Sequence, residues 1–191
     1  MHHLTDQYKT WLVLLAANIL SLAVVSHAYA ENCTIHLNKT TIDYGQLNRA
    51  NLLSTAQTGK IALGKRLLTL NIHCQESTPF ALQFHAPAAD QNTFRFSNTG
   101  NFSVSLSQAQ VDGKAVMLAS TKTAATPLNS IAAIATLEAN QTVTAMANSL
   151  PISGKNFTAQ VEVEAHIAPS TLRVREVTSL EGLGKFVMVQ P

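Results

Sequence analysis

The chain is organised around residues 33–74, CTIHLNKTTIDYGQLNRANLLSTAQTGKIALGKRLLTLNIHC, a stretch that begins and ends with the only two cysteines of the sequence. Each cysteine lies in a segment in which apolar and polar residues alternate, 33–37 and 68–74. Alternation with a period of two is typical of a β-strand with one buried face. Because both cysteines fall on the apolar faces, the sequence predicts a disulfide between Cys33 and Cys74 that joins two strands of a small exported β-domain.

The first thirty residues have the pattern of a secretory signal peptide. Residues 11–25 (WLVLLAANILSLAVV) are an apolar run that is short for a membrane span, which needs roughly 20 residues. The sequence Ala28-Tyr29-Ala30 follows and matches the small-residue pattern of signal cleavage. We expect cleavage between Ala30 and Glu31, with residues 1–30 as signal peptide and 31–191 as one domain without a membrane span. An uncleaved membrane anchor is the alternative, and the small residues before Glu31 disfavour it.

The charge of the chain argues against two classes of partner. The formal net charge is +2, and charged residues make up 13% of the sequence. Such a small excess of positive charge does not predict binding to nucleic acid or to a membrane surface.

Export to an oxidising compartment favours a disulfide between the two cysteines over two free thiols.

Short alternating segments recur along the rest of the chain, and no segment has a convincing helical pattern. Asp112-Gly113 between two alternating segments predicts a hairpin turn. The Ala-rich residues 131–147 predict a loop plus a strand, and residues 171–177 are ambiguous. The expected fold class is all-β, an antiparallel sandwich. The other expected strands are 33–37, 41–47 with a bend at Gly45, 60–63, 66–74, 79–85, 93–96, 102–111, 114–118, 157–167 and 184–189.

The order of these motifs resembles the pilin-type subunits of chaperone–usher fimbriae in Gram-negative bacteria, and more narrowly a poorly characterised branch of them. The resemblance covers essentially the whole chain after residue 30. It rests on Cys33 with its alternating strand, Ile42-Asp43-Tyr44-Gly45-Gln46-Leu47, Gly59, Leu63-Gly64-Lys65-Arg66, Leu70-Asn71-Ile72-His73-Cys74, the hairpin from 104 to 118, the strand 157–166 and the closing segment 185–190.

The resemblance implies an incomplete immunoglobulin-like sandwich that lacks its last strand and keeps an apolar groove open. A periplasmic chaperone fills the groove first, and the N-terminal segment of another fimbrial subunit then replaces it at the outer-membrane usher. It implies passage through the periplasm to the cell surface and a role in adhesion. The residues expected at the groove and the chaperone contact are Ile35, Leu37, Phe186, Val187, Met188 and Val189.

Two features depart from the family pattern. A donated strand needs roughly 10 residues at about 3.3 Å each, but after cleavage at Ala30 only Glu31 and Asn32 would precede Cys33. We therefore expect a subunit that receives a strand but donates none, which means a terminal subunit or a protein that does not polymerise. The family's aromatic residue near the C-terminus is replaced by Gln190-Pro191.

The sequence does not predict an enzyme, a metal site or a cofactor. His36 and His73 lie near the cysteines, but alternation places each on the face opposite its neighbouring cysteine, so a Cys₂His₂ zinc site is not expected. Glu162 and Glu164 share one strand face, which we interpret as a solvated outer face rather than an acid–base pair. The alternative to a fimbrial subunit is a self-complete periplasmic binding sandwich that closes its own groove with residues 131–147 or 171–184.

Overall fold

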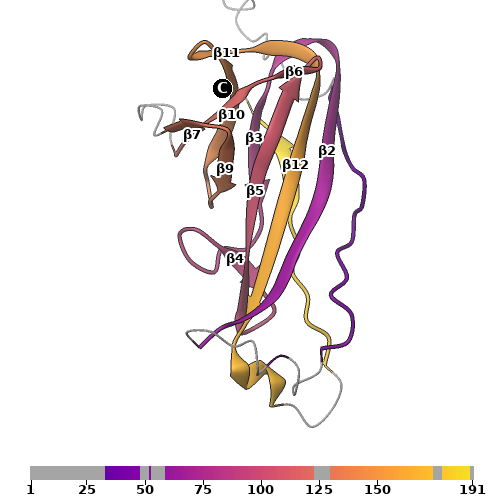
Figure 1. Ribbon diagram of the computed structural model, residues 1–191, viewed down its shortest axis with the longest axis vertical. Coiled ribbons are helices and arrows are strands. Elements are labelled where there is room, and N and C mark those ends of the chain that lie inside the picture. Colours follow the sequence, from indigo (N-terminus) through magenta and orange to yellow (C-terminus); the bar gives the residue numbers. More distant parts are fainter. Residues whose placement is uncertain (1–32, 48–51, 53–58, 123–129, 174–177, 190–191) are drawn as a thin grey trace, which may run out of the picture.

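The computed structural model describes residues 33–47, 52, 59–122, 130–173 and 178–189, and these residues form two antiparallel β-sheets packed face to face (Figure 1). The all-β sandwich predicted from the alternating segments is therefore confirmed. The first sheet has the order β1 (Cys33–Leu37), β2 (Ile61–Pro79), β12 (Ser153–Ile167), β5 (Gly100–Val111) and β4 (Phe94–Phe96), with β6 (Lys114–Ala115) and β9 (Ile134–Leu137) also paired to β5.

The second sheet has the order β13 (Lys185–Met188), β3 (Ala81–His85), β10 (Thr142–Ala147), β7 (Met117–Thr121) and β8 (Ser130–Ala132), with β11 (Leu150–Pro151) paired to β10. The chain passes from the first sheet to the second at Phe80, between β2 and β3. β1 pairs with β2 at one edge of the first sheet, and β13 pairs with β3 at one edge of the second sheet. The one described helix of more than a single residue is a 3₁₀ turn at Pro169–Leu172.

Most of the expected strands are present, and four segments differ. Residues 114–118 divide between β6 of the first sheet and β7 of the second. Residues 61–63 and 66–74, from two separate expected strands, belong to one long strand, β2, in which Gly64 adopts a φ of 85°. The Ala-rich segment forms most of β8 and all of β9 and β10, and the small side chains of Ala135 in β9 and Ala145 in β10 pack in the core. Residues 41–47 are not a strand. The Asp43 carboxylate accepts a hydrogen bond from the backbone N–H of Gly45 (2.7 Å), and Gly45 has a φ of 70°, so this segment turns instead of pairing.

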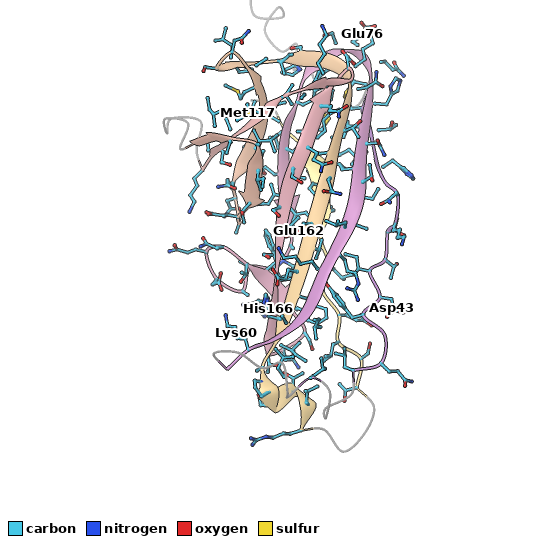
Figure 2. All side chains as sticks on the ribbon, viewed as in Figure 1. Asp43, Lys60, Glu76, Met117, Glu162 and His166 are labelled. Carbon is cyan, nitrogen blue, oxygen red and sulfur yellow. A yellow bond between two sulfur atoms is a disulfide. The ribbon has the colours of Figure 1, made fainter. Side chains whose placement is uncertain are left out.

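Alternation along the strands separates the core from the surface as expected. Val161 and Ala165 of β12 are each 1% exposed, whereas Glu162 and Glu164 between and beside them reach the outer face. Figure 2 places Glu162 midway along β12 and His166 near the end of that strand. Glu162 pairs with Lys65 of β2 (2.7 Å), and Glu164 lies 3.7 Å from His166. These contacts agree with the interpretation of this face as a solvated surface.

Candidate functional site: the groove between the edge strands

The predicted disulfide between Cys33 and Cys74 is present and fastens β1 to the rest of the first sheet. The two cysteines lie directly opposite each other in the β1–β2 pairing, which continues to Leu37 opposite Leu70. Cys74 is fully buried. After Leu37 the chain leaves β2, with the Asn38 side-chain carbonyl accepting a hydrogen bond from Thr69 N–H (2.9 Å). The segment that follows, residues 39–47, runs beside β2 as an extended coil (Figure 1).

A groove of about 930 Å³ lies between this coil and the C-terminal segment that leads into β13. One rim consists of residues 37 and 39–47, and the other of residues 178–184 and Phe186. Both rims carry polar side chains such as Lys39, Asp43 and Glu181. The floor is apolar and comes from both sheets: Leu63, Leu68, Phe84, Phe96, Phe102, Val104, Val161, Val163 and Ala165. An apolar trough with polar rims is suited to a segment that presents apolar side chains inward.

The strand β13 borders this groove and exposes half of its backbone hydrogen-bonding groups. Within the described residues β13 pairs only with β3, with Phe186 opposite Phe84 and Val187 opposite Gln83. The Val189 N–H donates to the Ala81 carbonyl (3.0 Å), so the backbone groups of Val189 and, by alternation, Val187 point toward β3. The N–H and C=O groups of Phe186 and Met188 therefore point to the open edge.

Aromatic rings fill the base of the groove beside β13. Phe84 packs edge-to-face against Phe94, Phe102 and Phe186, with ring centroids 4.9, 6.1 and 5.0 Å apart. Gly184 lies against the Phe84 ring so closely that a β-carbon at this position would overlap it. The glycine thus lets the rim segment run over the cluster before it enters β13. The Ser97 N–H donates to the Glu181 carbonyl (2.7 Å) and ties the same rim to the end of β4.

Tyr44 anchors the opposite rim. Its ring packs edge-to-face on Phe96 (6.3 Å between centroids), and the Arg66 guanidinium lies over it at 4.8 Å from the centroid. Burial raises the pKa of Tyr44. Ile42 and Leu47 of this rim also pack partly against the core. The rim is therefore held by side chains, since its backbone is not part of a strand.

The residues predicted for the groove divide into two groups. Leu37 and Phe186 line it. Ile35 is 37% exposed and lies outside the lining, as do Val187, Met188 and Val189. Met188 shares the inward face of β13 with Phe186 and packs partly on the core. The predicted cleavage site at Ala30 and Glu31 lies outside the described residues.

Sequence reasoning missed most of the floor of the groove. Val163, Ala165, Phe102 and Val104 belong to β12 and β5, far from both cysteines and from the closing strand in sequence. Their positions on the apolar faces of alternating segments marked them as inward-facing. That signal does not say which inward-facing residues lie under the open edge, because the strand order decides it.

No group of three or more His, Cys, Asp or Glu side chains among the described residues is placed to hold a metal ion. Nor does the described part of the chain contain a helix long and apolar enough to cross a membrane.

Comparisons with known proteins identify similar solved structures, among them the P pilus rod subunit PapA. It has 12% sequence identity and a TM-score of 0.41, and the alignment covers 83% of this chain and 98% of that one. No family model matches the sequence, and no curated protein matches it. A likeness at this identity and TM-score does not assign a function. The functional proposal is therefore based on the groove and its edge strand.

Proposed function

We propose that this protein is a structural subunit of a fimbrial-type surface fibre, and that a strand from another polypeptide completes its sandwich along β13. The observation that carries the proposal is the apolar-floored groove of about 930 Å³ beside a strand whose outer backbone groups have no partner in the described residues. The sequence motifs that resemble pilin-type subunits support the same assignment.

Strand addition would satisfy both features of this site at once. An added strand would bond to the backbone N–H and C=O groups of Phe186 and Met188, and its alternate side chains would enter the trough above Val163 and Ala165. Main-chain bonds supply affinity in this mode of recognition, and the side-chain pockets supply specificity. An open edge beside an apolar trough is an aggregation hazard, so the subunit would need a strand-donating chaperone before assembly.

The partners are those that the resemblance to pilin-type subunits implies. They are a periplasmic pilus chaperone, an outer-membrane usher and other fimbrial subunits, which gives a path through the periplasm to the cell surface and a role in adhesion. If cleavage occurs at Ala30, the mature chain has too short an N-terminal segment to donate a strand, and a terminal place in the fibre follows. The role is structural and does not include catalysis.

A second candidate is a self-complete periplasmic sandwich, and one observation favours it. Residues 178–184 already cover part of the groove, held by the Ser97–Glu181 hydrogen bond and by the contact of Gly184 with Phe84. In this reading the rim substitutes for a donated strand, and the remaining cavity binds a smaller ligand.

Export of the full chain with and without a periplasmic pilus chaperone separates the two candidates. The fimbrial proposal predicts degradation or aggregation of the chain alone and a 1:1 complex with the chaperone, seen by size-exclusion chromatography and native mass spectrometry. A chain that is a stable monomer, melts cooperatively and ignores the chaperone would overturn the proposal in favour of the self-complete sandwich. Intact-mass measurement of the exported chain tests cleavage at Ala30 separately.

A further inference from the structure

A second hollow lies on the outer face of the first sheet, on the side opposite the groove floor. It has a volume of about 140 Å³ and lies over β1, β2 and the start of β12. Two rows of polar residues cross it because the strands pair in register. They are Thr34, His73 and Asn156 in one row, and His36, Asn71 and Thr158 in the other.

We propose that His36 and His73 bind a divalent transition-metal ion of the class that prefers imidazole, such as Cu²⁺, Ni²⁺ or Zn²⁺. His36 lies opposite Asn71 on the neighbouring strand, and His73 is two residues further along that strand, on the same face. Such diagonal neighbours have β-carbons within roughly 7–8 Å. Two long imidazole side chains bridge that span when both turn toward an ion about 2.0–2.1 Å from each nitrogen.

The orientation of the His73 ring is fixed by Asn156, which Asp112 orients in turn. The Asp112 carboxylate accepts a hydrogen bond from the Asn156 side-chain amide (3.2 Å). Because a carboxylate only accepts, the amide nitrogen must face Asp112, and the amide oxygen faces His73 Nδ1 at 2.8 Å. His73 Nδ1 is then the donor, which leaves the lone pair of Nε2 available for a ligand. Hydrogen bonds of this kind orient metal-binding histidines and raise their basicity.

The His36 ring has no hydrogen-bonding partner within the described residues, so its nitrogens are available. Its strand is held in place by the disulfide three residues away, which fixes β1 against β2 at Cys33 and Cys74. The cysteines face the other side of the sheet, so the disulfide positions the strand without entering the hollow.

Two protein ligands make this a weaker site than a three-ligand centre, and water would occupy the remaining coordination positions. Affinity should then follow the general order for nitrogen ligands, in which Cu²⁺ exceeds Ni²⁺ and Zn²⁺. The metal site does not depend on the groove or on strand addition. A negative result for metal binding would therefore leave the proposed function untouched, and a negative result for strand addition would leave the metal site untouched.

Calorimetric titration with Cu²⁺ and electron paramagnetic resonance of the bound ion test the proposal, using the oxidised exported protein in its stable form, alone or with its chaperone. We expect two-imidazole nitrogen coupling in the wild type, lost in His36→Ala and in His73→Ala. His85→Ala is the matched control, because His85 is an exposed strand histidine of the second sheet whose ring contacts Gln83. It should leave the coupling unchanged.

Asn156→Ala tests the positioning of His73 without removing a ligand. We expect Cu²⁺ affinity to fall by about tenfold or more, the usual effect of losing an outer-shell partner, while the melting temperature without metal changes little. A double variant lacking both His36 and His73 that keeps the wild-type affinity and nitrogen coupling would overturn the metal site. Unchanged affinity in Asn156→Ala would overturn the role assigned to Asn156.

Discussion

Cys33 and Cys74 face each other across neighbouring strands of one sheet, so their disulfide joins β1 to β2 and does not bridge the two sheets. β1 is an edge strand of five residues, and it leads directly into the coil that forms one rim of the groove. The disulfide therefore fastens β1 to β2 at the end opposite the rim, and it supports the rim only through the pairing of β1.

Removing the disulfide should destabilise the protein and release β1 first. In the chain-entropy model a loop of this length contributes roughly 4 kcal/mol, and the Cys33→Ser/Cys74→Ser variant should lose most of it. Denaturant unfolding of the chaperone-free or complexed form measures the free energy, and hydrogen exchange locates the change. Faster exchange across β1 with an unchanged β12 is expected. Equal unfolding free energies for variant and wild type would contradict this role.

A charge in the floor of the groove should block strand capture. Val163 is half-buried and lines the groove on β12, so Val163→Arg would place a cation where an apolar donor side chain is expected. The yield of chaperone complex should fall at least tenfold, measured by co-purification. Gln160→Arg is the matched control, because Gln160 lies on the outer face of the same strand. Equal losses for both variants would mean that the effect is not specific to the groove.

Asp112 should make the β5–β6 hairpin sensitive to acid. Its carboxylate accepts hydrogen bonds from the backbone N–H of Asn156 (2.9 Å) and of Lys155 (3.1 Å) and from the Asn156 side chain (3.2 Å). The bond from Asn156 N–H, ahead of the others, lowers the pKa of Asp112. A lowered pKa stabilises the fold above the ordinary carboxyl pKa, and this stabilisation is lost as pH falls through the folded-state value.

The measurement is the melting temperature of the wild type and of Asp112→Asn between pH 7 and pH 2. The wild type should lose more stability than the variant below about pH 4, where an unperturbed carboxyl takes up its proton. Parallel curves for the two proteins would show that Asp112 contributes nothing to the acid sensitivity.

The sequence predicted what alternation and cysteines encode, and it missed what strand order decides. Cys33 and Cys74 on apolar faces were enough to predict their disulfide, and Asp112-Gly113 marked the hairpin correctly. Residues 41–47 alternate like a strand, yet the Asp43–Gly45 turn removes them from the sheet. Val187 and Val189 are as apolar as Phe186, and only the pairing with β3 shows that their side chains face away from the groove.

Amide hydrogen exchange along β13, compared between the uncomplemented protein and its chaperone or donor-strand complex, tests the central claim most directly. The N–H groups of Phe186 and Met188 point to the open edge, whereas those of Val187 and Val189 point toward β3. Strand addition predicts that Phe186 and Met188 become protected by at least a hundredfold on complex formation, while Val187 and Val189 change little. If Phe186 and Met188 exchange at the same rate in both forms, no strand adds to β13 and the proposed mode of assembly is wrong.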